Sequence, residues 1–245
     1  MSRVRSIPDV SPVRETHPVG VSPSFLRPIL GGGTAPSVEG VLRSRLSPVL
    51  PAAVIAALAA LVLILPFPGS LSVVATRSLS GTFSAIPGVA LLSEILLVLL
   101  AVATAGALVH VVMRHPERRG AALAAAFGVG VAYAASEGVK LLVAQPRPCS
   151  SGDLRIECPP PGDWSFPSNH ATLAFGAVVV IIVAIQRVSV AWLAVGAAAL
   201  VAGGRVAQGV HYLHDVAAGA LLGLAIPVAL VAAIHGWKER TRRRR

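Results

Sequence analysis

The sequence predicts an all-α protein, a six-transmembrane-helix bundle with both termini in the cytoplasm. Two observations support this fold class. Apolar residues make up 54% of the 245 residues and charged residues only 13%, a composition typical of integral membrane proteins. Six apolar stretches also approach the roughly 20 residues that a helix needs to cross a bilayer, and they lie at 49–68, 89–113, 121–144, 169–186, 190–208 and 214–236.

The ends of these stretches carry residues that start or stop helices. Pro146 and Pro148 force the chain out of a helix after the third stretch. Ser168 precedes the fourth stretch and suits an N-cap. The fifth stretch is the least regular, because Gly203-Gly204-Arg205 interrupts its end. Small residues are abundant throughout and let helices pack closely in lipid.

The length of the chain suffices for one bundle and leaves no room for a second large domain. We expect a disordered, basic, Pro/Ser/Gly-rich cytoplasmic tail at 1–46, the membrane domain at 47–237 and a basic cytoplasmic tail at 238–245. The N-terminus contains Arg3 and Arg5 but no early apolar core, so we do not expect a cleaved signal peptide.

The orientation follows from the basic residues. Most of the 21 Lys and Arg residues lie in the two tails and in the connections around 114–119 and 187, all on one side of a six-span bundle. The positive-inside rule places that side in the cytoplasm. We therefore expect a multi-pass protein of the cytoplasmic membrane, whose connections at 145–168 and 209–213 face outside.

A net charge of +10 can also indicate a nucleic-acid-binding protein. Aromatic residues account for only 4% of the chain, however, so there are few platforms on which bases could stack. The basic residues are also placed as juxtamembrane anchors. The expected partners are thus the lipid bilayer and a membrane lipid, and not nucleic acid.

The two cysteines, Cys149 and Cys158, lie in one Pro-rich connection on the expected outer side. That compartment permits disulfides, so the two residues can form one. Two free thiols are the alternative. A zinc site is disfavoured, because neither a further Cys nor a close His accompanies them.

Three short polar clusters interrupt the apolar sequence. The first is Lys140 with Arg147-Pro148, an ammonium and a guanidinium that can grip one phosphate. Cations that snorkel to the interface would also explain this pair. The second is Pro167-Ser168-Asn169-His170, where the first amides of a helix would point at an anion and His170 could protonate a leaving oxygen. A simple capped helix with an interfacial histidine is the alternative.

The third cluster is Arg205 with His211 and Asp215. If residues 211–215 are helical, His211 and Asp215 lie one turn apart on the same face. Asp215 could then accept one imidazole N–H and leave the other nitrogen free to attack phosphorus. A pair of histidine metal ligands is the competing interpretation, but no carboxylate-rich cluster joins them.

In order and spacing, the three clusters resemble those of the type 2 phosphatidate phosphatase superfamily of membrane lipid phosphatases, which includes prenyl diphosphate phosphatases. The signature of that family is Lys-x6-Arg-Pro, then Pro-Ser-Gly-His, then Ser-Arg-x5-His-x3-Asp. The resemblance covers residues 140 to about 219, and the six-span layout extends it across the membrane region.

The resemblance implies a role for each residue of the clusters. His211 would form a phosphohistidine, Asp215 would orient it, and His170 would act as general acid and then as base. The residues implied to hold the phosphate are Lys140, Arg147, Ser168, Asn169 and Arg205. These cations would neutralise the charge that a metal otherwise would, so neither a metal nor another cofactor is expected.

Two positions depart from the signature, since Asn169 replaces a glycine and Gly204 a serine. Neither change removes a catalytic group, but both bear on substrate preference. Among neighbouring residues, Glu137 is expected to pair with Lys140 one turn away, and Glu94 could face the same cavity. His214 could contact a second phosphate or simply lie at the interface.

Together these features predict a membrane enzyme that hydrolyses a lipid phosphate or diphosphate at the outer face. Prenyl diphosphates of cell-wall synthesis are the first candidate substrates, followed by phosphatidate and phosphatidylglycerol phosphate. A lipid phosphotransferase would use the same first step, and a non-catalytic protein that binds anionic lipids would use the same cations. The oligomeric state stays open.

Overall fold

The computed structural model describes residues 69–86, 88–151 and 158–244. Within these ranges the chain forms helices and no strand: α2 (Leu71–Phe83), α3 (Val89–Arg114), α4 (Pro116–Val143), the 3₁₀ helix η1 (Pro148–Ser151), α5 (Asn169–Ile185), α6 (Val188–Ala207) and α7 (Leu213–Arg243). The all-α expectation is confirmed. The first expected span at 49–68 and the expected tail at 1–46 lie outside the described residues.

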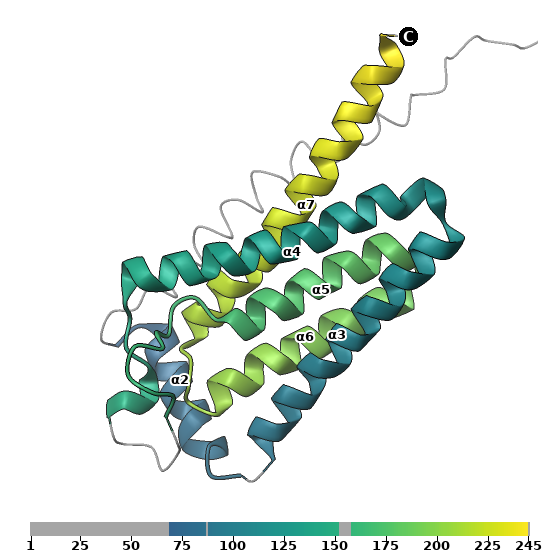
Figure 1. The fold of residues 1–245 in the computed structure, drawn as a ribbon. Helices are drawn as coiled ribbons and strands as arrows, with labels where there is room; N and C mark the ends of the chain where they lie inside the picture. Colours follow the sequence, from purple (N-terminus) through teal and green to yellow (C-terminus); the bar gives the residue numbers. More distant parts are fainter. Residues whose placement is uncertain (1–68, 87, 152–157, 245) are drawn as a thin grey trace, which may run out of the picture. The chain divides into compact units, whose positions relative to one another are not determined.

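Helix α5 forms the centre of the bundle and packs against α3, α4, α6 and α7 (Figure 1). Its Val178–Ile181 segment is buried, as are Ala171, Ala174 and Ala184. The surrounding helices expose large apolar side chains instead, such as Leu91 and Val102 on α3. Because apolar side chains facing outward are stable in lipid and costly in water, this pattern fits a bundle immersed in a membrane.

Four of the helices, α3, α4, α6 and α7, are long and apolar enough to cross a membrane. Helix α5 is shorter, with 17 residues, and lies inside the others. The structure also corrects two boundaries. Helix α6 continues through Gly203 and Gly204 to Ala207, and α7 extends beyond the expected end at 236 to Arg243, so the basic C-terminal residues prolong the last helix.

Two glycines let the start of α7 approach α5 at the distance of backbone contact. A Cβ atom at Gly219 would lie 2.3 Å from the Ser168 carbonyl oxygen, and one at Gly223 would lie 2.3 Å from the Thr172 carbonyl oxygen. The same approach allows the Ser168 amide to donate to the Asp215 carbonyl oxygen at 3.0 Å. The second and third polar clusters of the sequence are thereby held against each other.

Helix α2 is an element that the sequence analysis did not identify. Its polar residues Ser72, Thr76 and Ser80 recur every four positions and are buried, whereas apolar residues such as Leu71 and Val74 are exposed. This inverted pattern is typical of a helix that lies along a membrane interface with its apolar face in lipid. The polar face contacts the start of α7, where Thr76 accepts a hydrogen bond from the Leu213 amide at 3.1 Å.

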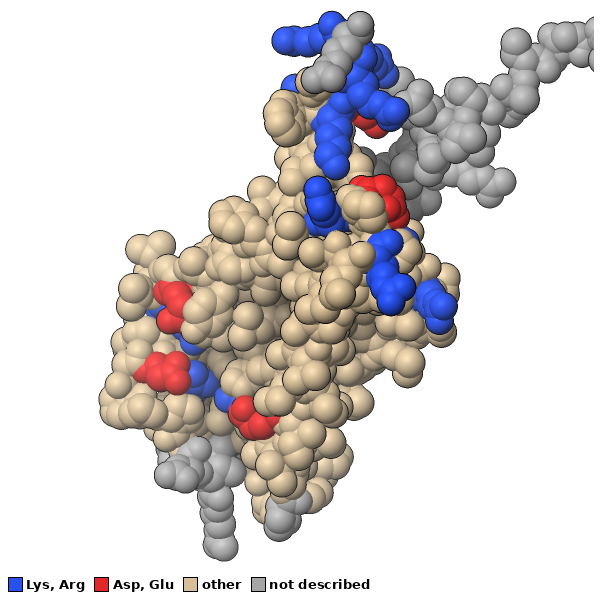
Figure 2. Space-filling view, turned by 45° about the vertical axis from the view of Figure 1, so that its right-hand side comes forward, with Lys and Arg blue, Asp and Glu red and all other residues tan. Residues whose placement is uncertain are grey.

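Basic side chains gather at one end of the bundle. The α3–α4 connection and the C-terminal part of α7 lie there, and Arg118, Arg187 and Lys238 line one common hollow. Figure 2 shows Lys and Arg side chains gathered at the top and right of the view, and acidic side chains beside partly covered basic ones at the other end. The three polar clusters lie at the end of the bundle away from the α3–α4 connection and the C-terminal part of α7 (Figure 1).

The close contact between α5 and α7 predicts the effect of a single methyl group. Gly223→Ala should lower the melting temperature in detergent, because its Cβ overlaps the backbone of α5, and overpacking of this kind costs about 1–3 kcal/mol. Gly236→Ala is the matched control on the same helix, where a Cβ meets nothing within 4 Å. Equal melting temperatures for the two variants would contradict the close approach.

Candidate active site

The three polar clusters converge on one cavity of about 380 Å³. Lys140 reaches it from the end of α4, Arg147 from the loop before η1, His170 from the first turn of α5, Arg205 from the end of α6, and His211 from the loop before α7. The other side chains that line it are Leu97, Tyr133, Glu137, Asp163, Asn169 and Leu173. Residues spread over more than 70 positions of the sequence thus share one site, as the sequence analysis expected.

His211 is buried beside this cavity with its two ring nitrogens in different surroundings. Nδ1 lies 2.8 Å from the Ser165 carbonyl oxygen, and Nε2 lies 3.1 Å from Nη1 of Arg147. A carbonyl only accepts and a guanidinium only donates, so the proton is on Nδ1 and the lone pair is on Nε2. Burial lowers the pKa of His211 to about 4, more than the neighbouring Asp215 raises it. His211 is therefore a neutral imidazole whose Nε2 lone pair accepts a hydrogen bond from Arg147.

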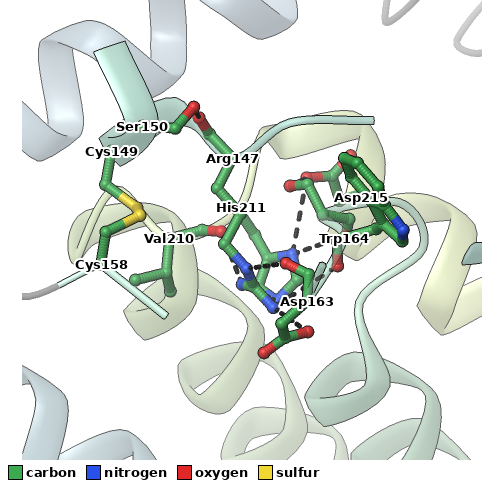
Figure 3. Close-up of a disulfide and its surroundings, with 10 residues drawn as sticks. Arg147, Cys149, Ser150, Cys158, Asp163, Trp164, Val210, His211 and Asp215 are labelled. Atoms are coloured by element: carbon green, nitrogen blue, oxygen red, sulfur yellow. Dashed lines mark hydrogen bonds and ion pairs between the residues drawn. A yellow bond between two sulfur atoms is a disulfide. The ribbon is translucent and has the colours of Figure 1, made fainter. Parts of the chain in front are cut away.

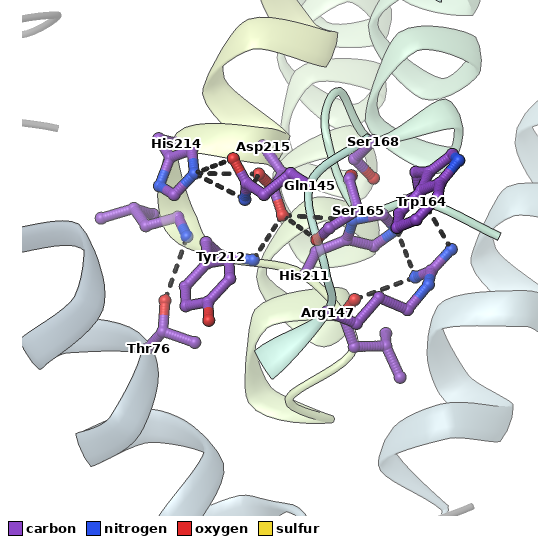
Figure 4. A network of polar contacts seen from close by, with 12 residues as sticks. Thr76, Gln145, Arg147, Trp164, Ser165, Ser168, His211, Tyr212, His214 and Asp215 are labelled. Carbon is purple, nitrogen blue, oxygen red and sulfur yellow. Dashed lines mark hydrogen bonds and ion pairs between the residues drawn. The ribbon is translucent and has the colours of Figure 1, made fainter. Parts of the chain in front are cut away.

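Asp215 lies behind His211 and is fully buried (Figure 4). Oδ2 accepts from the Tyr212 amide at 2.7 Å and from the Ser165 hydroxyl, and Oδ1 accepts from Gln145 at 3.0 Å. Nδ1 of His211 is 3.5 Å from Oδ2 of Asp215, farther than it is from the Ser165 carbonyl oxygen. The imidazole is thus held by two acceptors, of which the sequence analysis identified only Asp215.

The reason for this arrangement is that His211 does not belong to α7. The helix begins at Leu213, Tyr212 is its N-cap, and Asp215 caps the Tyr212 amide. The condition that residues 211–215 form one helical turn is therefore not met. His211 instead lies in the loop, where the Ser165 carbonyl can reach its Nδ1.

His214 is not among the residues that line the cavity. Its ring is buried, with Nδ1 2.7 Å from the Ser72 hydroxyl and Nε2 3.1 Å from Oδ1 of Asp215. Nε2 also lies 2.9 Å from Nε2 and 3.2 Å from Oε1 of the Gln145 side chain. His214 therefore joins α2 to the buried carboxylate.

Arg147 is held by two loops, the one that carries the disulfide and the one between α6 and α7 (Figure 3). Its Nε donates to the Asp163 carbonyl at 2.8 Å, its Nη2 to Oδ1 of Asp163 at 2.8 Å, and its Nη1 to the Val210 carbonyl at 2.9 Å. Cys149 and Cys158 form the disulfide of the first loop, with Cα atoms 5.7 Å apart. The two loops therefore fix the guanidinium beside His211.

Each cation of the cavity has a carboxylate partner. Lys140 contacts Glu137 at 3.4 Å, as expected, and also Asp163 at 3.6 Å. Arg205 contacts Glu94 at 3.0 Å. Partial burial opposes the ionisation of Asp163, but its hydrogen bond to Arg147 and the charges of Arg147 and Lys140 outweigh burial and lower its pKa.

His170 contacts the same carboxylate as Arg205, since its Nε2 lies 3.2 Å from Oε1 of Glu94. Glu94 thus contacts two residues that line the cavity but is not itself among the lining residues. Two residues that touch the cations were not identified: Asp163, and Gln208, whose Oε1 accepts from Arg205 at 3.1 Å. Both residues contact motif residues in the folded protein, but neither belongs to a motif of the sequence.

Ser168 and Arg205 each have a buried polar atom without a hydrogen-bond partner among the described residues, and of the two only Arg205 lines the cavity. Ser168 occupies the N-cap position of α5, but its hydroxyl does not bond the helix amides as expected. Its Oγ and the Nε of Arg205 are buried and have no hydrogen-bond partner within the described part of the chain. Buried donors of this kind are costly unless a ligand satisfies them, which fits a site that binds phosphate oxygens.

The structure also accounts for the two departures from the family signature. Asn169 turns its side chain toward α4, where it accepts from Ser136 and donates to Glu137. At Gly204, a Cβ atom would lie 2.9 Å from the Cβ of Ser93. Ser93 on α3 fills that space and donates to the Val201 carbonyl at 3.1 Å. Both positions therefore tie a neighbouring helix to the site.

The described residues include no group of three or more His, Cys, Asp or Glu side chains that could hold a metal ion. The ionisable groups of the cavity instead alternate between cations and carboxylates. Chemically, the arrangement offers one unprotonated imidazole nitrogen beside fixed cations, and a second imidazole across the same cavity.

The low pKa of His211 predicts a pH dependence of stability. The unfolded chain protonates this histidine below about 6.5 and the folded protein only near 4, so folding stability falls as the pH drops through this range. The full penalty is about 3 kcal/mol at the acid end, since each pKa unit corresponds to 1.36 kcal/mol. Wild type should therefore lose more thermal stability than His211→Asn between pH 7 and 4.5. Parallel loss in both proteins would contradict a buried, neutral His211.

Comparisons with known proteins agree with the geometry. The model of the PAP2 superfamily matches residues 121–239. Over 129 residues the chain is 34% identical to the decaprenylphosphoryl-5-phosphoribose phosphatase of Mycobacterium tuberculosis. The matched region covers 53% of this chain and 70% of that protein. The crystal structure of LpxE from Aquifex aeolicus superposes with a TM-score of 0.53 at 21% identity, over 69% of this chain and 99% of that one. The chain belongs to the PAP2 superfamily, the type 2 phosphatidate phosphatases.

Proposed function

We propose that this protein hydrolyses a membrane lipid phosphate at the extracytoplasmic face through a phosphohistidine on His211. Hydrolysis of a lipid phosphate is the activity that its relatives support. The observation that carries the proposed mechanism is the lone pair of His211 Nε2 beside the fixed guanidinium of Arg147. A nucleophile in its reactive tautomer next to a phosphate-binding cation is suited to phosphoryl transfer.

In the first step, Nε2 of His211 attacks phosphorus and the P–O bond to the lipid breaks. The leaving oxygen takes a proton from His170, which gives a free lipid hydroxyl and a phosphohistidine. His170 then removes a proton from water as the water oxygen attacks phosphorus, and the P–N bond breaks to release inorganic phosphate. Proton transfers of this kind require a group that can both donate and accept a proton, which an imidazole provides.

The other side chains stabilise the charge of the transferring group. Lys140, Arg147 and Arg205 would contact the equatorial oxygens of phosphorus, where negative charge accumulates. The free Oγ of Ser168 and the backbone amide of Asn169 at the start of α5 add neutral donors. With three fixed cations in these positions, we propose that no divalent ion is needed.

The lipid class is narrowed by the relatives and by the cavity. The mycobacterial relative is a phosphatase of a decaprenyl-linked phosphoribose, which favours a polyprenyl lipid over a diacylglycerol lipid for this chain. Leu97 and Leu173 line one side of the cavity and offer an apolar wall for the first carbons of a chain. Prenyl diphosphates remain candidates, because they present a terminal phosphate at the same interface.

The proposed function predicts metal-independent phosphate release by the purified protein. Prenyl diphosphate, prenyl-phosphoryl-5-phosphoribose and phosphatidate are offered in detergent with a chelator. Wild type should release phosphate from at least one of them, and His211→Ala should retain less than about 1% of that rate, since loss of a catalytic nucleophile costs several orders of magnitude. Residual activity at a tenth of wild type would contradict the role of His211.

The phosphotransferase alternative is tested in the same reaction. A transferase would form the phosphohistidine but would not pass the phosphoryl group to water. With ³²P-labelled lipid and no other acceptor, the labelled phosphohistidine would accumulate on the protein and little phosphate would be released. A hydrolase turns over many times without an added acceptor. A protein that only binds anionic lipid would do neither.

The proposed orientation predicts that the disulfide of Cys149 and Cys158 lies outside the cell. An impermeant thiol reagent should label intact cells only after reduction, because these are the two cysteines of the chain. The Cys149→Ser/Cys158→Ser double variant controls for labelling of other proteins. Labelling that requires permeabilised cells would reverse the orientation.

A further inference from the structure

Three carboxylates pair with the cations of the cavity: Glu94, Glu137 and Asp163, here called the acidic rim. Glu137 and Asp163 line the cavity, and Glu94 contacts two residues that line it, His170 and Arg205. Their side chains are 43–53% exposed, whereas those of their partners Lys140, Arg147 and Arg205 are only 5–11% exposed. Figure 2 shows acidic and basic side chains next to each other at this end of the bundle. The cations thus form the floor of the site and the carboxylates its rim. Fixed charges of the two signs cancel in the empty site.

Two members of the acidic rim occupy positions that substrate oxygens need. A single oxygen of Glu94, Oε1, contacts both Nη1 of Arg205 at 3.0 Å and Nε2 of His170 at 3.2 Å. In the proposed reaction, the same two side chains must bind a phosphoryl oxygen and the leaving oxygen. Glu94 therefore stands where the phosphate ester has to bind.

Asp163 likewise occupies a position that a phosphate oxygen needs, beside Arg147 and Lys140. Its Oδ1 contacts Nη2 of Arg147 at 2.8 Å and Nζ of Lys140 at 3.6 Å. Both cations belong to the proposed phosphate cradle. A phosphomonoester carries about two negative charges at neutral pH, so it competes with the carboxylates for these donors and repels them.

Displaced carboxylates need new donors. Glu137 keeps one, because the amide of Asn169 also donates to it, but Glu94 and Asp163 would be left beside a dianion. Hydroxyl groups on the atoms next to the phosphate would lie within reach of a half-exposed rim. A hydrogen bond from a hydroxyl to a carboxylate is charge-assisted and about twice as strong as a neutral one. A phosphate on a bare alkyl chain offers no such donor.

We propose that the acidic rim selects lipids whose terminal phosphate sits on a polyhydroxylated group such as a sugar. The phosphate takes the cations from Glu94 and Asp163, and the sugar hydroxyls then donate to the carboxylates that it displaced. This inference rests on the proposed function and adds the class of head group to it. Glu94, Glu137 and Asp163 are specificity residues and take no part in bond breaking.

The test uses two synthetic lipids of equal charge and equal tail. One is farnesyl-phosphoryl-5-phosphoribose, and the other is its analogue with hydrogen in place of the 2- and 3-hydroxyls. Wild type should prefer the hydroxylated lipid by about tenfold in kcat/KM, the equivalent of one charge-assisted hydrogen bond. Glu94→Gln and Asp163→Asn keep the shape of the rim but remove its charge.

The two variants should change the KM values of the two substrates in opposite directions. The KM of the hydroxylated lipid should rise, because its acceptor is weakened. The KM of the dideoxy analogue should fall, because the phosphate no longer displaces a carboxylate. A merely structural role would impair both substrates alike. Glu117→Gln is the matched control, since Glu117 is an exposed acid at the other end of α4 and should leave the preference unchanged.

Failure of this inference is distinct from failure of the proposed function. Equal kcat/KM for the two lipids in wild type, or equal losses on both in the variants, would overturn selection by the rim while phosphate release persists. Absence of phosphate release from every lipid by folded wild type would overturn the function itself and the inference with it.

Discussion

The site depends on one buried carboxylate, that of Asp215. It accepts hydrogen bonds from the Tyr212 amide, the Ser165 hydroxyl and the Gln145 amide group, and it also contacts His214. Burial of a charge without such partners costs several kcal/mol, so the donors are required for the fold and are not accessory. Because they come from different segments, satisfying one side chain fixes the α4–α5 loop, the start of α7 and, through His214 and Ser72, helix α2.

The reactive state of His211 follows from this network. The Ser165 hydroxyl binds Asp215, which places the Ser165 carbonyl at Nδ1 of His211. The tautomer of the imidazole is therefore set by the backbone of a loop, and the carboxylate acts partly by holding that loop. Asp215 thus has two roles in the site: it holds the loop, and its charge acts on the imidazole. The comparison with a catalytic triad describes only the effect of the charge.

Sequence reasoning could find the residues of the site because their chemistry is costly in a membrane. Lys140, Arg205 and His211 stand out in apolar surroundings, and their spacing matched a family. It could not find Ser165, Gln145 or Asp163, since such residues are common in polar loops and acquire their roles only when the loop folds over the cavity. The helices at 89–113, 121–144, 169–186, 190–208 and 214–236 were located from hydropathy within a few residues at most boundaries.

Helix α2 was missed for a related physical reason. Its 13 residues are too few to cross a bilayer, and its Ser72, Thr76 and Ser80 stripe faces protein while its apolar side faces outward. A search for apolar stretches ignores such a helix. A search for polar residues at four-residue spacing beside apolar ones would have found it, but would not have shown that Ser72 supports the network around Asp215.

The proposed chemistry and the proposed selection draw on overlapping parts of the chain. The family match covers residues 121–239, which include the proposed nucleophile His211, the proposed acid His170 and the three cations, together with Glu137 and Asp163 of the rim. Helix α3 lies outside that match, yet it supplies Glu94 to the rim and Ser93 to the space at Gly204. A helix that contacts the phosphate cations without taking part in the reaction can change its residues at little cost to catalysis. We therefore propose that variation in α3 is one physical route by which a phosphatase of this fold comes to select different head groups.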